Sequence, residues 1–330
     1  MNTVLLITGI LLLIIALVEG LWTTIWVDGN SAPITGRLTS GVWKGMRAVI
    51  SSKSHKALSL AGPFILFLTV IFWIVLLWLG WSLVFYADQS SIDAKDGSPP
   101  DLSDAMWYVA YCMFTIGNGD FMPKEDGWQL LSSLVGLTGM ALVTLSITYV
   151  LQVVSAVVNK RAFASQVTSI GQSAEEFVLK QWNGKDFGAI ELQLNSLSGQ
   201  LAVLDEQHMA FPILHYYHAA DYQKSQDVAI TILDDALTLI EFGIKEEHQP
   251  AQTILASTRN SISTFLQTVQ SAFITAAKET PEAPKLVKLT NKGLPTVPEQ
   301  EFHHKLEEKL KDRRKLLLGL TQNGAWEWPA

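Results

Sequence analysis

The chain has 330 residues, of which 48% are hydrophobic and one is a cysteine, and its formal net charge is −7. A single cysteine excludes a disulfide within the chain, and the negative charge without a basic cluster argues against nucleic-acid binding. The sequence contains no nucleophile–base set, phosphate-binding glycine loop or zinc motif. We therefore predict a protein that is not an enzyme and needs no cofactor.

The first hydrophobic run, residues 2–18, is followed by Trp22 and Trp26. It lacks the basic start and the small-residue cleavage site of a secretory signal peptide, which is the alternative interpretation. We predict an additional N-terminal membrane helix in residues 1–27. Its tryptophans would lie at the membrane interface.

Two longer uncharged runs follow, at residues 61–87 and 128–158. Each is long enough to cross about 30 Å of hydrocarbon as a helix. Between them, residues 102–114 are apolar but too few to cross. A short helix followed by irregular backbone is tolerated at membrane depth only where it lines a cavity. The pattern predicts a pore module at 61–158, with an outer helix, a short pore helix and an inner helix at these three places.

The connecting segments differ in charge. Residues 28–60 are rich in lysine and arginine, whereas residues 88–127 are rich in aspartate and glutamate. The positive-inside rule places the first segment, predicted as a basic loop, and everything after residue 159 in the cytoplasm. The N-terminus and the pore loop then face outward, in a multi-pass protein of the cell (plasma or inner) membrane. The acids form either a solvated turret or, chiefly at Asp120, a mouth that concentrates cations.

The segment between the pore helix and the inner helix carries an unusual glycine pattern. It reads Thr115, Ile116, Gly117, Asn118, Gly119 and Asp120. Glycine reaches positive φ at low cost, so alternating backbone conformations can aim successive carbonyls in one direction. A ring of such carbonyls replaces the hydration shell of a permeating cation. Taken alone, these residues favour a simple turn, but the flanking apolar runs reverse that preference and favour an ion filter.

The stretch from Trp107 to Pro123, WYVAYCMFTIGNGDFMP, resembles the pore region of potassium channels of the two-transmembrane, one-pore-loop, prokaryotic type. The resemblance covers roughly residues 61–158. In that family the pore helix begins with two aromatic residues, here Trp107 and Tyr108. It ends at a T-V-G-Y-G-D filter, where this chain reads T-I-G-N-G-D. Gly139 lies near the position of the family's gating-hinge glycine, although helix packing explains a glycine there equally well.

Three positions depart from the family pattern. Asn118 replaces a tyrosine or phenylalanine, Phe114 replaces a second threonine, and Tyr111 replaces a glutamate that several members carry behind the filter. The resemblance implies K⁺ as the permeant ion and four copies around one pore. It also implies filter support by Trp107, Tyr108, Tyr111 and Phe114.

Residues 159–280 have helical periodicity and lack the signatures of dinucleotide-binding, cyclic-nucleotide-binding and EF-hand domains. We predict a helical cytoplasmic bundle. Its His208, His215 and His218 are expected to pack locally. No cysteine is nearby and no carboxylate has a ligand spacing, so no metal is expected beyond the permeant cation.

The end of the chain divides by composition. Prolines in residues 281–298 predict a linker with little helix. Residues 299–330 predict a charged helix followed by a tail. The helix is either a short coiled coil or a surface helix.

These expectations combine into an all-α membrane protein, a tetrameric pore-loop channel with a helical cytoplasmic domain. One chain supplies one pore loop, so a central pore requires a cyclic assembly, here a homotetramer in the lipid bilayer. The main hypothesis is a cation channel that passes K⁺ and is gated by an unknown signal, such as a cytoplasmic ligand. A weakly selective Na⁺/K⁺ channel, suggested by Asn118, is one alternative. A non-conducting membrane receptor or scaffold is the other.

Overall fold

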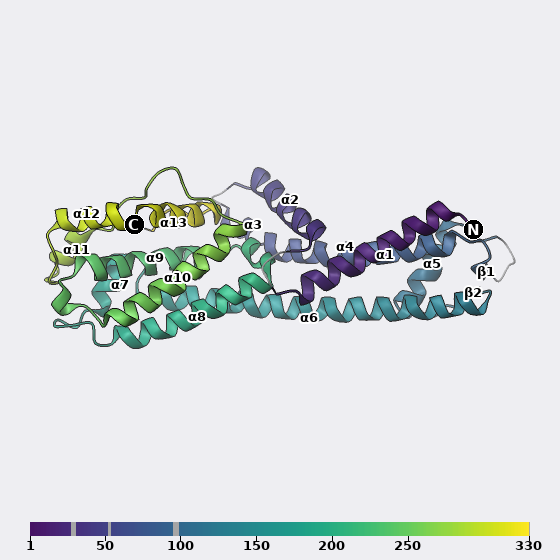
Figure 1. Ribbon diagram of the computed structural model, residues 1–330, viewed down its shortest axis with the longest axis horizontal. Coiled ribbons are helices and arrows are strands. Elements are labelled where there is room, and N and C mark those ends of the chain that lie inside the picture. Colours follow the sequence, from purple (N-terminus) through teal and green to yellow (C-terminus); the bar gives the residue numbers. More distant parts are fainter. Residues whose placement is uncertain (28–30, 52–53, 95–98, 330) are drawn as a thin grey trace. The chain divides into compact units, whose positions relative to one another are not determined.

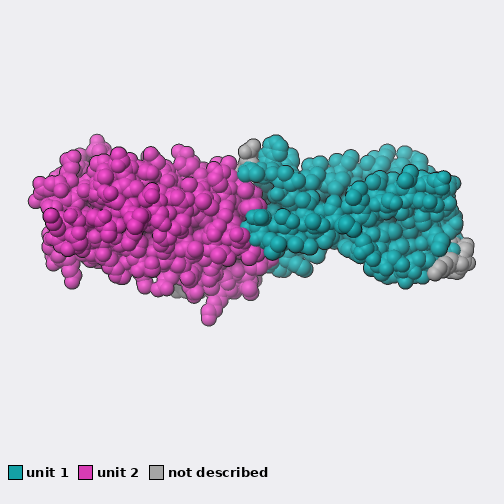
Figure 2. Space-filling view, turned by 90° about the horizontal axis from the view of Figure 1, so that it is seen from below, with its two compact units in different colours: residues 1–27, 31–42, 64–153 teal, residues 28–30, 43–63, 154–330 magenta. Residues whose placement is uncertain are grey.

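The computed structural model describes residues 1–27, 31–51, 54–94 and 99–329. These residues divide into two compact units (Figure 2). Unit 1 contains residues 1–27, 31–42 and 64–153, and unit 2 contains the remaining described residues, 43–63 and those from 154 on. Helices α2, α4 and α6 contribute residues to both units.

Unit 1 is almost wholly helical (Figure 1). Its elements are α1 (Thr3–Ile25), the start of α2 (Pro33–Val49), α4 (Ala61–Tyr86), β1 (Ile92–Ala94), α5 (Leu102–Met113), β2 (Phe121–Pro123) and most of α6 (Asp126–Ile170). Strands β1 and β2 pair antiparallel, with Asp93 opposite Met122. Within the described residues, three helical stretches are long and apolar enough to cross a membrane: Thr3–Ile25, His55–Tyr86 and Asp126–Ile170. The predicted fold class, an all-α membrane protein, is confirmed.

Tryptophans of α4 connect the outer helix to the two helices that flank the filter segment. The indole nitrogen of Trp78 donates to the carbonyl of Met106 in α5 at 2.9 Å. That of Trp81 donates to Thr138 Oγ1 in α6 at 3.0 Å. An indole N–H in an apolar setting needs such a partner, so both bonds fix how α4 packs on α5 and α6.

A buried carboxylate joins α1 to α2. Glu19, which is 3% exposed, accepts from the backbone nitrogens of Ile34 at 3.0 Å and Thr35 at 2.8 Å. These nitrogens lie in the first turn of α2, where free N–H groups and the helix dipole favour a negative charge. The Thr35 hydroxyl also donates to Glu19 and accepts from the indole of Trp73 in α4. The indole of Trp73 in turn packs on Tyr149 in α6.

Residues 33–49, inside the segment that the sequence predicts as a basic loop, therefore form helix α2 instead. Its three glycines lower its intrinsic helix propensity, and its N-terminal cap comes from Glu19 of the preceding helix. Local propensity is a weak guide where a tertiary contact supplies the cap.

Unit 2 is also helical. Its remaining elements are α3 (His55–Leu58), α7 (Ala174–Gln181), α8 (Ile190–Ala210), η1 (Pro212–Tyr216), η2 (Tyr222–Lys224), α9 (Gln226–Thr238), η3 (Leu239–Gly243), η4 (Glu246–His248), α10 (Gln252–Ala272), α11 (Leu286–Thr290), α12 (Glu299–Lys309) and α13 (Lys311–Asn323).

The C-terminal segments belong to the same core as the rest of unit 2. Leu289, Phe302 and Leu317 are fully buried in the cluster that also contains α8, α9 and α10. The predicted linker 281–298 contains the short helix α11 and pairs Thr296 with Ile244. The prolines disfavour regular helix in this segment, but its leucines still attach it to the core because they bury apolar surface.

The predicted single helix at the C-terminus is two helices in the structure. They are interrupted at Leu310, whose φ of −123° and ψ of 0° leave the helical region. The break turns Leu310 and Leu317 into the common core.

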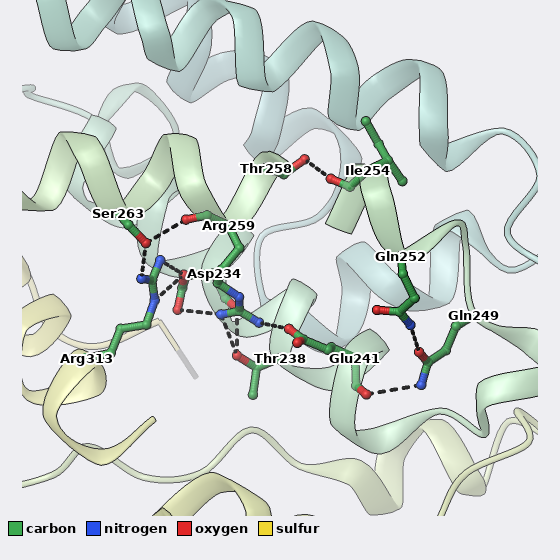
Figure 3. A network of polar contacts seen from close by, with 10 residues as sticks. All are labelled: Asp234, Thr238, Glu241, Gln249, Gln252, Ile254, Thr258, Arg259, Ser263 and Arg313. Atoms are coloured by element: carbon green, nitrogen blue, oxygen red, sulfur yellow. Dashed lines mark hydrogen bonds and ion pairs between the residues drawn. The ribbon is translucent and has the colours of Figure 1, made fainter. Parts of the chain in front are cut away.

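Unit 2 also buries a network of ion pairs (Figure 3). Asp234 of α9 has no exposed surface and accepts from Arg313 of α13 at 2.6 Å and 2.9 Å. Arg259 of α10 lies 3.2 Å from Asp234 and 2.9 Å from Glu241. Burial alone would raise the pKa of Asp234, but Arg259 and Arg313 hold this pKa below its usual value. The network thus ties α9, α10 and α13 together with matched charges.

Replacing Asp234 with alanine is expected to destabilise unit 2 by about 3–5 kcal/mol, because it leaves buried arginine charges without their partner. The measurement is denaturant or thermal unfolding of the purified full chain. Glu301→Ala is the control, since its pair with Lys305 is exposed, and it should change stability by at most about 1 kcal/mol. Equal effects of the two changes would contradict the prediction.

Candidate ion filter

Helix α5 has a capped start and ends at the filter segment. At its start, the Asp101 side chain accepts from the Asp104 backbone nitrogen at 3.0 Å, and the Asp104 side chain accepts from that of Asp101 at 2.9 Å. This reciprocal capping box sets where the helix begins. At its end, Phe114 leaves the helix, and the negative end of the helix dipole lies next to the filter segment.

The filter segment has a backbone of alternating φ sign. Thr115, Gly117 and Gly119 have φ values of 57°, 65° and 73°, and neither Ile116 nor Asn118 has a positive φ. Positive φ costs glycine little, but for a β-branched residue such as Thr115 it is a strained conformation. Such strain persists where the surroundings require it, and it is concentrated at functional sites.

Tyrosines of α5 lie behind the filter segment. The carbonyl of Tyr111 accepts from the backbone nitrogen of Ile116 at 2.9 Å, and its hydroxyl donates to the carbonyl of Phe121 at 2.5 Å. Tyr108 is hydrogen-bonded to Ser132 of α6 and packs edge-on against Tyr111. These contacts tie both sides of the filter segment to Tyr111, and Tyr108 joins α5 to α6.

The other two residues predicted to support the filter lie differently. Trp107 and Phe114 are each 44% exposed in the single chain. The Trp107 ring still meets Tyr111 edge-on, at 6.2 Å between centroids. Of the four predicted residues, Tyr108 and Tyr111 are thus the ones that the structure buries behind the segment.

Asn118 and Asp120 interact with each other. The amide of Asn118 donates to the carboxylate of Asp120. Residues 114–118 are exposed in the single chain, and no neighbour lies within 4 Å of where a Cβ on Gly117 would stand. The segment therefore presents an uncovered backbone.

Gly139 lies where α6 crosses the end of α5. A Cβ at this position would stand 2.9 Å from the carbonyl oxygen of Met113. Helix α6 continues through this point without interruption. Close packing thus accounts for a glycine here, and the hinge role stays a prediction.

A buried lysine lies where α6 enters unit 2. The Lys160 ammonium donates to the carbonyls of Leu214 and Tyr217, each at 3.1 Å. Asp227 faces the same small pocket. Burial raises the pKa of Asp227, and the Lys160 charge opposes that rise. Carbonyls in and just after η1, together with the nearby carboxylate of Asp227, therefore stabilise the position of α6 around Lys160. No sequence pattern predicted this contact.

A second contact missed from the sequence involves His55. Its Nδ1 lies 3.0 Å from Nε2 of His218, and the Trp326 ring stacks on His55 at 3.9 Å between centroids. The stack joins the segment before α4 to the C-terminal tail. Partners so distant in the sequence leave no local signal.

The three histidines singled out in the sequence have separate partners. Nδ1 of His208 lies 2.9 Å from the carbonyl of Leu204, and Nε2 of His215 lies 3.0 Å from the side-chain oxygen of Asn323. His218 pairs with His55 as described. Burial, assisted by neighbouring positive groups, lowers the pKa of all three histidines to about 3.

Comparison with known proteins gives two kinds of match. Residues 69–156, which include the filter segment, match a family model described as ion channel. Over its full length the chain is 41% identical to the uncharacterized membrane protein YdjJ of Bacillus subtilis and covers 96% of that protein. A segment of 66 residues is 32% identical to potassium voltage-gated channel subfamily A member 2 of Xenopus laevis, and 30% identical to that of Mus musculus. That segment is 20% of this chain and 13% of each relative. No solved structure matches the chain.

The buried histidines predict a stability that falls with acidity. Their native pKa of about 3 lies below the unfolded value of 6.5, so between these limits the unfolded state binds more protons. The contribution of these histidines to the free energy of unfolding is fully present above pH 6.5. As the pH falls below that value, each histidine lowers the free energy of unfolding by roughly 1.4 kcal/mol per pH unit. Unfolding of the full chain from about pH 7.5 to 5 measures this slope. His208→Gln should flatten it, whereas His303→Gln, at an exposed site, should not; equal slopes in all three proteins would refute it.

Proposed function

The chain belongs to the family of the membrane protein YdjJ, and we propose that it is a tetrameric cation channel that passes K⁺ through the backbone carbonyls of residues 115–119. The observation that carries the proposal is the alternating φ of Thr115, Gly117 and Gly119. Four such segments around an axis supply rings of carbonyl oxygens. The match of this region to an ion channel family supports transport rather than catalysis.

Several copies are needed because one chain supplies one filter segment, and residues 114–118 of that segment are exposed in the single chain. A cyclic assembly would cover that backbone with its own symmetry mates. The C-terminal end of α5 then directs its partial negative charge toward the axis, which favours a cation there. The arrangement accords with the two-transmembrane, one-pore-loop type, preceded here by α1.

Gating is proposed to act through the end of α6. Lys160 binds this part of the helix to η1, and a signal that moves η1 would bias α6. The excess of basic residues in 28–60 favours a cytoplasmic location for unit 2, with the filter and the N-terminus outside.

Gly117→Ala is expected to reduce K⁺ flux by about tenfold or more, because an L-residue at positive φ costs about 1–2 kcal/mol. The measurement is K⁺ efflux from proteoliposomes that contain the purified chain. Gly127→Ala is the matched control, since Gly127 also has open space around it but no positive φ. Wild-type flux in Gly117→Ala, or no cation flux by the unaltered chain, would refute the proposal.

A second candidate is a weakly selective channel that also passes Na⁺. The observation in its favour is Asn118, whose side chain binds Asp120 of the same loop instead of packing behind the filter as an aromatic ring would. A filter without that packing has less to fix its width, and width is one basis of K⁺ selectivity.

Reversal potentials in opposed K⁺ and Na⁺ gradients separate the two candidates. A weakly selective filter should reverse well away from the K⁺ equilibrium potential, and Asn118→Tyr should shift reversal toward it, because the ring can pack against α5. Asn118→Gln is the control, since it keeps a polar amide. Reversal at the K⁺ potential in the unaltered chain would exclude weak selectivity.

A further inference from the structure

Unit 2 has an open groove between α8 and α10. The two helices lie side by side (Figure 1) and are joined inside by a hydrogen bond of 3.0 Å from Ser198 to Thr258. Outside that bond, small side chains such as Ala202 and Ala256 leave a hollow of about 660 Å³. Its size is that of small-molecule sites, which enclose about 300–1,000 Å³.

A buried carboxylate with one unsatisfied oxygen lines this groove. Asp205 is 7% exposed, and its Oδ1 atom has no hydrogen-bond partner in the described part of the chain. Leaving a buried polar atom unsatisfied is unfavourable, and more so for a charged group.

Other buried acids in unit 2 are partnered. Asp234 contacts Arg259 and Arg313, and Asp235 contacts Arg314. Asp205 differs in that it opens to a groove. An unsatisfied carboxylate at such a place has the properties of a ligand-binding group.

The chemistry of the lining defines the ligand. A second acid, Glu206, is exposed at the rim, and the wall from α10 supplies polar oxygens of Ser257, Asn260 and Ser261. None of the lining residues is basic. Such a site attracts a cation with several N–H donors, and an ammonium group has three.

A bare metal ion fits less well. The described residues contain no group of three or more histidine, cysteine, aspartate or glutamate side chains that could hold one. The hollow is also much larger than the roughly 30 Å³ that one water molecule occupies. An aliphatic stem beside Ala202 and Ala256 would fill the remaining space.

We propose that the groove between α8 and α10 binds a small aliphatic amine, whose ammonium group pairs with Asp205 and whose stem lies along the small side chains. Binding does not depend on conduction. That the amine comes from the cytoplasm rests on the proposed orientation.

The test is calorimetric titration of the full chain in nanodiscs of zwitterionic lipid, with putrescine as the probe. Neutral lipid avoids binding of the amine to the membrane. Saturable binding is expected, and Asp205→Asn should weaken it by about tenfold or more because a charge-assisted bond is lost. Glu308→Gln, which removes an exposed acid outside the groove, is the matched control and should leave it unchanged. Diacetylputrescine, which lacks the charges, should not bind.

Thermal unfolding without ligand measures whether the Asp205→Asn variant is folded. Asp205→Asn should keep or raise the melting temperature, because it removes an unsatisfied buried charge. Undiminished putrescine binding by Asp205→Asn would overturn the proposal, as would tighter binding of Mg²⁺ than of putrescine.

A change of oligomeric state in Asp205→Asn without an effect on putrescine would also overturn it, in favour of a contact between copies of the chain. Loss of ion flux in the unaltered chain would refute the proposed channel and leave the amine site standing, because the titration measures binding alone.

Discussion

Backbone amides and carbonyls at membrane depth must find hydrogen-bond partners, and this constraint shapes unit 1. Helices α1, α4 and α6 satisfy it internally along their length. Irregular backbone occurs between α5 and β2. There the carbonyl of Tyr111 accepts a hydrogen bond from the backbone nitrogen of Ile116, and the hydroxyl of Tyr111 donates to the carbonyl of Phe121. The strained Thr115 is held between these bonds. Under the proposed function, the exposed carbonyls of this segment take the place of water around a cation.

Buried polar groups also need partners in unit 2, where several of them are charged. Lys160 meets two carbonyls and faces Asp227, and Asp234 meets two arginines. Removing one partner from such a set costs more than the set contributes when complete. Burial is therefore tolerated because the partners come from several helices at once. Asp205 departs from this rule and stands out for that reason.

The membrane-capable helices and the positive φ of Gly117 and Gly119 could be predicted because their signals are local. Uncharged length identifies a span, and two glycines around Asn118 identify a backbone that needs positive φ. The contacts between Glu19 and α2, and between His55 and Trp326, could not be predicted. Each joins residues that are distant in the sequence and of ordinary type, so only the folded chain brings them together. The burial of Leu286 and Leu289 within residues 281–298 could not be predicted, because prolines mark local breaks but say nothing of where neighbouring leucines pack.

Glu19 has a consequence for how the chain enters the membrane. It carries the only charge of α1, and the amides that accommodate it belong to a later segment that begins at Pro33. Until α2 has been synthesised, the carboxylate of Glu19 must stay hydrated near the surface or bind a proton, since an unpaired charge in hydrocarbon is costly. Helix α1 can therefore take a stable position in the membrane only after the first turn of α2 has formed. Biogenesis would then proceed by pairs of helices, with the N-terminal helix settling after its successor.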